Sequence, residues 1–274
     1  MRRMRTTILF GSLVFAGVGC PLIAGVKDGV LGDGGIQPGG DAHDDAPSDL
    51  PRGDAGCAAF PDASFCDDFD HGLLGARWDG IGGGGGRPSL DDDAAVSPPH
   101  SVVVTSVTPD APANMDVYFY KNLPGGLPRD LLCEFDVRVD SPEAPSFTAF
   151  ETSTSVAGVQ YLIRLWLGTS VGRVDAIYNY SDGGGSRGQY HIPTLATGPW
   201  RHVGIALSLP ETGDGGVRVA FDDLQVLDVT IATPVADGGG LVMNFGARYM
   251  VVEQGFGLRF DNFVCSWGSL AAGR

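Results

Sequence analysis

The chain has 274 residues, of which 33 are acidic and 18 are Lys or Arg, so its formal net charge is −15. This balance argues against nucleic-acid binding, which depends on basic side chains that neutralise phosphates. It also argues against electrostatic docking to anionic lipid.

The N-terminus has the three parts of a secretory signal peptide. Residues 1–5 are basic, residues 6–18 form an apolar run, and small residues follow. The apolar run is too short to span a bilayer comfortably, and a segment of this pattern is removed on export. We therefore predict a signal peptide over residues 1–19 and an exported protein.

Cys20 ends this run, and two interpretations of it stay open. Gly19 directly before the cysteine resembles the lipobox of bacterial lipoproteins, in which the cysteine becomes the lipidated N-terminus. Lipoboxes usually have Leu where this chain has Gly17, and Gly17 and Gly19 also fit ordinary signal peptidase. We favour lipidation, because a cysteine left over in an exported chain needs an explanation. The resemblance implies a lipoprotein of a bacterial envelope membrane or cell surface; the alternative is a soluble secreted protein.

Residues 27–55, which make up most of the segment 20–56, are rich in Asp, Gly and Pro and have few aromatic or large apolar side chains. Such a segment cannot bury enough surface to offset the entropy of ordering it. We predict a disordered tether here, followed by one folded domain over residues 57–268 and a short tail over residues 269–274.

The folded domain is predicted to be all-β. Short apolar or alternating runs recur between clusters of Gly, Pro, Asp and Ser, which is typical of a sandwich or barrel. Residues 82–86 are five glycines, interpreted as a flexible loop because the Lys and Ser or Thr of a phosphate loop do not follow. The expected strands are residues 101–107, 117–120, 131–139, 146–152, 160–167, 173–180, 202–209, 217–221, 224–231, 241–245 and 258–265.

Four cysteines lie in the domain: Cys57, Cys66, Cys133 and Cys265. An even number in an exported chain implies two disulfides, and the spacing lacks the C-x-x-C pairs of a zinc site. Three connectivities are open. We favour Cys57–Cys66 together with Cys133–Cys265, which would tie an early strand to the last one.

Three segments, in this order, resemble the concanavalin A-like lectin/glucanase superfamily, and within it laminin-G-like jelly rolls. Residues 65–70 with Trp78 are similar to its opening strand, residues 198–205 with 217–223 to its "W-x-H-V … v-x-v-D-G" hairpin, and residues 259–264 to its closing strand. The resemblance implies a two-sheet antiparallel jelly-roll sandwich with a concave face and with the first and last strands adjacent. It departs at Asp223, where the family has Gly.

No catalytic centre is expected from the sequence. Glycosidases of this superfamily cluster carboxylates on one strand, because an acid and a nucleophile must flank one bond. The nearest match is Glu134-x-Asp136, but Arg138 has the next position on that face, and a guanidinium is neither nucleophile nor acid. We interpret this set as a charged solvent face, and Glu151 and Glu253 stand alone. The prediction is a protein that is not an enzyme, with a glycoside hydrolase as the alternative.

Aromatic side chains give a candidate ligand site, since sugar sites stack rings on sugar faces. Arg164 and Trp166 share one face of their strand, and Tyr178 and Tyr180 share one face of the next. The other interpretation, which we favour, is that these aromatics fill the core between the sheets.

A structural calcium ion is a further hypothesis, with Asp68 and Asp261 on adjacent first and last strands as oxygen ligands. Solvated or hydrogen-bonded aspartates are the alternative. The histidines His71, His100, His191 and His202 lack the spacing of a metal site.

The function predicted from these features is a tethered, non-catalytic module that binds a polysaccharide or a surface protein. A structural envelope lipoprotein without a small ligand is the alternative. We expect membrane contact through the lipid anchor only, and no nucleic-acid partner.

Overall fold

The computed structural model describes residues 56–106, 113–123, 128–156, 159–180, 185–210, 214–232 and 240–268, without the side chains of residues 156, 179 and 180. The predicted signal peptide, Cys20, nearly all of the tether and the tail lie outside the described residues. No helix in the described part of the chain is long and apolar enough to cross a membrane.

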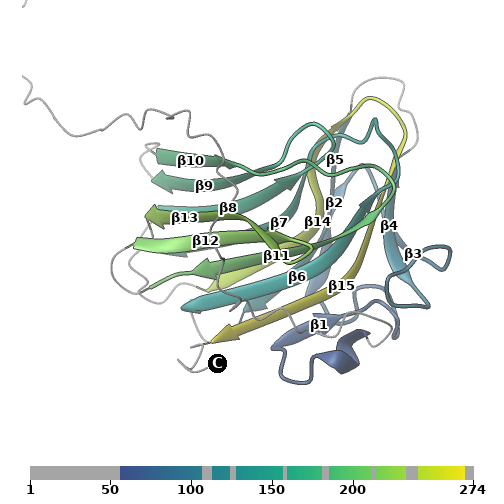
Figure 1. The fold of residues 1–274 in the computed structure, drawn as a ribbon, viewed down its shortest axis with the longest axis horizontal. Helices are drawn as coiled ribbons and strands as arrows, with labels where there is room; N and C mark the ends of the chain where they lie inside the picture. The colour runs from purple at the N-terminus through teal and green to yellow at the C-terminus, as the bar shows by residue number, and fades with distance from the viewer. Residues whose placement is uncertain are drawn as a thin grey trace, which may run out of the picture. The chain divides into compact units, whose positions relative to one another are not determined.

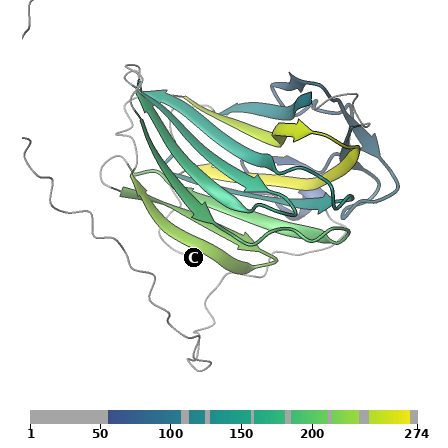
Figure 2. The ribbon, with the colours of Figure 1, turned by 90° about the horizontal axis from the view of Figure 1, so that it is seen from above.

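The described residues form an all-β sandwich of two antiparallel sheets (Figure 1), which confirms the predicted fold class. Sheet A has the order β13-β12-β11-β6-β15-β4-β3, with β1 also paired to β15, and sheet B has the order β10-β9-β8-β7-β14-β5-β2. Figure 2 shows the sheets from above, with the green strands β12 and β13 at one side. A short 3-10 helix, η1 (Gly56–Ala59), precedes the strands, which are β1 (Phe65–Asp67), β2 (Gly80–Gly84), β3 (Pro88–Asp91), β4 (Ser101–Ser106), β5 (Ala113–Leu123), β6 (Asp130–Val139), β7 (Phe147–Val156), β8 (Val159–Leu167), β9 (Arg173–Tyr180), β10 (Gly185–His191), β11 (Trp200–Ser208), β12 (Asp214–Phe221), β13 (Leu224–Ala232), β14 (Leu241–Val252) and β15 (Phe256–Gly268).

The core lies between the sheets and is rich in phenylalanine. Alternation along each strand sends every second side chain inward, so Phe135 of β6, Phe245 of β14 and Phe263 of β15 meet with no exposed surface. The ring centroids of Phe245 and Phe263 are 4.3 Å apart. Trp78 packs onto this group, and its indole N–H donates to Asp67 at 2.8 Å. These rings hold the two sheets together, because aromatic side chains bury the most apolar area.

Two disulfides join the cysteines in the favoured pairing. Cys57 is bonded to Cys66 and Cys133 to Cys265, and Cys133 lies directly opposite Cys265 where β6 pairs with β15. Strand β1 also pairs with β15, so the first and last strands are adjacent, as the superfamily resemblance implied. Disulfides are typical of proteins outside the reducing cytosol, which indicates an exported protein.

Asp223, which stands where the resembling family has Gly, still forms part of a tight hairpin turn. Asp222 and Asp223, between β12 and β13, have φ angles of 47° and 69°. Positive φ at two successive residues is the geometry of a tight type I′ hairpin turn, in which Asp is tolerated beside the preferred Gly and Asn. The Asp222 carboxylate also accepts the backbone N–H of His202 at 3.0 Å.

The prediction that the glycine run is a flexible loop was wrong for Gly82–Gly84, because strand β2 spans Gly80–Gly84 and pairs with β5. A Cβ placed at Gly82 would lie 2.5 Å from the Tyr118 ring, and one at Gly80 would lie 2.7 Å from the Tyr120 ring. The glycines therefore let two tyrosine rings lie across the strand. Strands β3 and β10 were also missed.

Candidate functional site

Polar and charged side chains cover the face of sheet B that points away from the core. In β8, Leu165 and Leu167 are fully buried toward sheet A, so Arg164 and Trp166 between them point outward. Register then aligns the outward side chains of neighbouring strands into rows. One row is His191, Arg173, Trp166, Thr148, Arg248. The next is Gln189, Asp175, Arg164, Glu151, Asn244, Tyr120. We call this surface the polar face.

The centre of the polar face is the buried carboxylate of Glu151 on β7, which is only 3% exposed. It accepts hydrogen bonds from Arg164 Nε at 2.5 Å, from Asn244 Nδ2 at 3.2 Å, from the Tyr249 hydroxyl at 3.1 Å, and from Arg248 Nη1. A buried carboxylate is stable only when it is paired and hydrogen-bonded. Glu151 therefore fixes two arginines and a tyrosine in one place.

Tyr249 lies between the two arginines and is 40% exposed. Its hydroxyl also accepts a hydrogen bond from Arg164 Nη2 at 3.1 Å, and the guanidinium carbons of Arg164 and Arg248 lie 4.4 and 4.6 Å from its ring centre. Its φ of 57° belongs to a bulge in β14, where the pairing with β5 shifts between Ala247 and Met250. A non-glycine residue at positive φ is uncommon, and such strain clusters at functional sites.

Burial, followed by the charge of Glu151, raises the pKa of the Tyr249 phenol. The phenol is therefore protonated at neutral pH in the free protein. The two neighbouring guanidiniums act in the opposite direction, since a positive charge favours a phenolate. Tyr249 is thus an exposed phenol beside two fixed guanidinium groups.

A second group of arginines lies two strands away, around Asp175 of β9. The Asp175 side chain is fully buried and accepts from Arg187 Nη2 at 2.6 Å and from Gln189 Nε2 at 3.1 Å. Arg173 forms an ion pair with the same carboxylate at 3.2 Å, and its guanidinium lies 4.7 Å from the centre of the Trp166 ring. The Trp166 ring in turn lies 6.2 Å from that of Tyr249.

The polar face carries more positive than negative charge, although the chain as a whole is strongly acidic. Four arginines outnumber three carboxylates in this cluster by one charge, whereas the whole chain has a net charge of −15. A cationic patch on an acidic protein is suited to a negatively charged ligand. The residues counted are Arg164, Arg173, Arg187 and Arg248 with Asp116, Glu151 and Asp175.

The structure separates the residues of the predicted ligand site. Arg164 and Trp166 lie on the polar face, whereas Tyr178 points between the sheets, packs 5.2 Å from the Tyr161 ring and donates its hydroxyl to the carbonyl of Ala232. Burial raises the pKa of Tyr178 to about 12. Tyr178 is therefore a half-buried residue on the inward side of sheet B, and the side chain of Tyr180 is outside the described part. The sequence analysis treated Glu151 as an isolated carboxylate and did not consider Arg248 or Tyr249. No motif or spacing in the sequence links these residues, which lie on different strands.

The predicted calcium ligands do not fit a cation. The Asp261 carboxylate accepts the backbone N–H groups of Val96, Ser97 and Asn262, and Asp68 accepts that of Cys57. N–H groups that point at these oxygens would repel a metal ion. No group of three or more His, Cys, Asp or Glu in the described residues is arranged to hold a metal.

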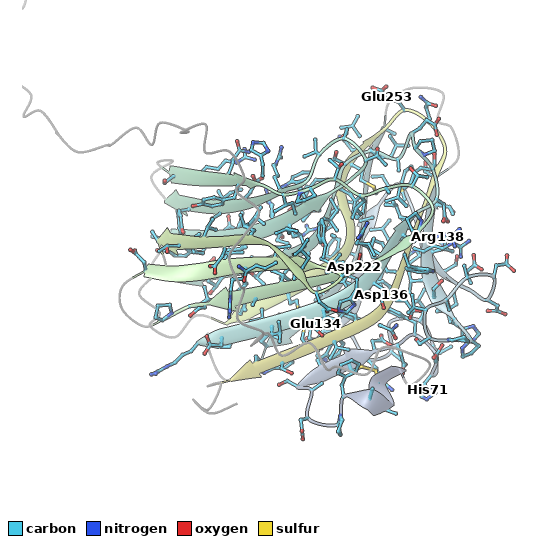
Figure 3. All side chains as sticks on the ribbon, in the orientation of Figure 1. His71, Glu134, Asp136, Arg138, Asp222 and Glu253 are labelled. Atoms are coloured by element: carbon cyan, nitrogen blue, oxygen red, sulfur yellow. A yellow bond between two sulfur atoms is a disulfide. The ribbon has the colours of Figure 1, made fainter. Side chains whose placement is uncertain are left out.

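Glu134, Asp136 and Arg138 follow one another along β6 on the outward face of sheet A, with Glu253 far from them (Figure 3). The Asp136 carboxylate is bonded to His202 Nδ1 at 3.0 Å and to Asn262 Nδ2 at 2.9 Å, and Arg138 is paired with Asp140 at 2.7 Å. These side chains form a charged network on sheet A, on the opposite side of the sandwich from Tyr249.

No protein-family model matches this chain, and no curated protein sequence is significantly similar to it. Several solved structures are similar to it. An endo-β-1,4-glucuronan lyase from the fungus Trichoderma reesei superposes with a TM-score of 0.61 at 14% identity, over 74% of this chain and 95% of the lyase. The cellulose-induced protein Cip1 gives a TM-score of 0.49 at 18% identity, over 74% and 96% of the two chains. An alginate lyase from Chlorella virus gives 0.49 at 11% identity, over 70% and 92%.

The prediction that the chain is not an enzyme was wrong. It rested on the missing carboxylate pair, and that pair is required by glycoside hydrolysis. The glucuronan lyase shows that the same sandwich carries a different reaction class. The absence of a hydrolase motif therefore argues against a glycosidase and says nothing about a lyase.

Proposed function

We propose that the domain is a polysaccharide lyase that cleaves an acidic, uronate-containing polysaccharide on the polar face of sheet B. The observation that carries this proposal is the Tyr249 phenol, held between Arg164 and Arg248 by the buried Glu151 carboxylate. The fold shared with a glucuronan lyase is consistent with it.

The reaction proposed is β-elimination. Tyr249, as the phenolate, removes the proton from the carbon that bears the uronate carboxylate. The electrons of that C–H bond form a carbon–carbon double bond, the adjacent bond to the glycosidic oxygen breaks, and the leaving oxygen takes the proton back from Tyr249. Proton transfer by one positioned side chain is a standard form of general acid–base catalysis.

The arginines give this chemistry its electrostatic support. Removal of a proton beside a carboxylate places further negative charge on that carboxylate, and fixed positive charge lowers the cost. Arg164 is the better candidate to contact it, because its side chain is 19% exposed and that of Arg248 is 11%. Arg248, which also bonds to Asp116 and stacks on Tyr118, holds the Tyr249 side of the site in place.

Export places this activity outside the cytosol. We include lipidation at Cys20 and a tether over residues 20–56 in the proposal, because an anchored domain on a long tether reaches a polymer beside the membrane. The laminin-G-like grouping stays a prediction.

The test is to incubate the protein with β-1,4-glucuronan, alginate and polygalacturonate and to follow the ultraviolet absorbance of unsaturated sugar ends. At least one polymer is expected to be cleaved, with cleavage lost in Tyr249→Phe and kept in Tyr190→Phe, a matched change on the core side of the same sheet. Absence of unsaturated products from every polymer, or full activity of Tyr249→Phe, contradicts the proposal.

A further inference from the structure

We propose that Asp175, Arg173 and Arg187 form a second anion subsite, which holds another carboxylate of the same acidic chain that occupies the Tyr249 site. This inference rests on the proposed function for its ligand class, a polyuronate. It concerns binding and not the chemical step.

The geometry of this second group repeats that of the first. At the Tyr249 site, one buried carboxylate holds two arginines and an amide: Glu151 with Arg164, Arg248 and Asn244. On β9 and β10, the fully buried Asp175 likewise holds Arg173, Arg187 and Gln189.

Two arginines on one carboxylate leave a surplus positive charge. One guanidinium is sufficient to neutralise a buried carboxylate, so the second is not needed to stabilise Asp175. Arg187 keeps 47% of its side chain exposed and Arg173 keeps 26%. Each arginine carries several N–H donors, so donors remain for an incoming carboxylate, which guanidinium groups bind in a two-pronged geometry.

The position of this group relative to Tyr249 suits one polymer chain. Asp175 lies opposite Arg164, and Arg164 lies opposite Glu151, in adjacent strand pairs. The two carboxylates are thus two strands apart, about 10 Å, because neighbouring strands lie about 4.8 Å apart. Trp166 lies opposite Arg173 in the neighbouring row, and its ring approaches both Arg173 and Tyr249. A polysaccharide that crosses the strands would contact both arginine groups and the indole between them.

The subsite predicts that affinity depends on chain length. A short oligouronide fills the Tyr249 site alone, whereas a longer one also reaches Arg187. Binding is measured on the Tyr249→Phe protein, so that cleavage does not interfere, with oligoglucuronides of increasing length and with neutral cello-oligosaccharides as the uncharged comparison.

In this background, Arg187→Ala is expected to weaken binding of the longer oligoglucuronides by about tenfold, which is typical for loss of a charge-assisted hydrogen bond. Binding of the shortest oligomer is expected to stay the same. Arg187→Lys keeps the charge and should restore part of the affinity. Arg218→Ala, which removes an exposed arginine from sheet A, is the matched control and should have no effect at any length.

Equal affinity of the Arg187→Ala and Arg218→Ala proteins for long oligomers would overturn the subsite. So would a loss of affinity in Arg187→Ala that is the same at every oligomer length. A Tyr249→Phe protein that binds neutral and acidic chains equally well would also contradict it. Failure of the lyase proposal looks different. If no polymer is cleaved but Arg187→Ala still shows the length-dependent loss, the subsite stands and the lyase activity does not. If cleavage occurs and the Arg187→Ala protein binds normally, the lyase activity stands and the subsite does not.

Discussion

The Glu151 carboxylate on β7 accepts the Nε–H of Arg164 on β8 at 2.5 Å, and the two residues lie directly opposite each other in sheet B. Arg248 and Tyr249 reach the same carboxylate from β14, on the other side of β7. One buried acid therefore organises groups from three strands, and its removal affects all of them.

Glu151→Gln is expected to lower the free energy of unfolding by about 3 kcal/mol, because it leaves the largely buried Arg164 guanidinium without an anion and Arg248 with Asp116 alone. Urea unfolding measures this. The control is Glu143→Gln, which changes an exposed glutamate that accepts a hydrogen bond from Ser141. Its urea midpoint should equal that of the unchanged protein. Equal midpoints for the two variants would show that Glu151 does not stabilise the arginine pair.

Cleavage of an acidic polysaccharide is expected to rise with pH above neutrality. Burial raises the pKa of Tyr249, so the phenolate that removes the proton becomes more abundant only in alkaline solution. The rate at subsaturating substrate, measured from pH 6 to pH 10, checks this expectation. A rate that is flat across this range, or that falls from pH 6 upward, would assign the proton transfer to another group.

Asp261 is expected to make the protein less stable as the pH rises toward neutrality. Burial, the largest cause, raises its pKa from 3.8 to about 7. Between these values the folded protein keeps a proton that the unfolded chain has released, so the free energy of unfolding falls as the pH rises through this window. The carboxylate of Asp79, whose pKa is lowered to about 2 by hydrogen bonds from Asn122 and Lys121, contributes only below this window.

Asp261→Asn removes this titration and keeps one oxygen to accept the N–H groups of Val96 and Ser97. Urea unfolding of both proteins at several pH values between 4 and 7.5 should give a smaller decline for the variant than for the parent. Parallel curves would show that Asp261 is already ionised in the folded protein throughout this range.

Gly82→Ala is expected to lower the free energy of unfolding by about 1–3 kcal/mol, the usual cost of forcing an atom into a packed site. The added Cβ would lie 2.5 Å from the Tyr118 ring. Gly84→Ala in the same strand is the control, because nothing lies within 4 Å of its Cβ position. Thermal unfolding compares the two, and an equal change in both midpoints would mean that the Tyr118 ring does not lie on β2.

Much of the fold was predictable because strand formation is encoded locally. Apolar and charged residues alternate from Cys133 to Asp140, which predicts one buried and one solvent-facing side. In β6, Phe135 and Val137 are fully buried and Glu134 and Arg138 face outward, but Asp136 on the outward side is buried as well. Inward and outward side chains alternate with a period of two whatever the strand pairs with. The cysteine count predicted two disulfides for a similar reason, since it depends on composition and compartment.

Only the tertiary structure decided the site and the role of the glycines. Glu151, Arg164 and Tyr249 come from three strands, and sheet register brings them together, which no local pattern reveals. The sequence placed Arg164 and Tyr178 on candidate ligand faces, but pairing turned Arg164 outward and Tyr178 inward. The glycine run is a strand because Tyr118 and Tyr120 from β5 cover it. Local periodicity determined where strands form in this protein, and long-range pairing determined which side chains meet.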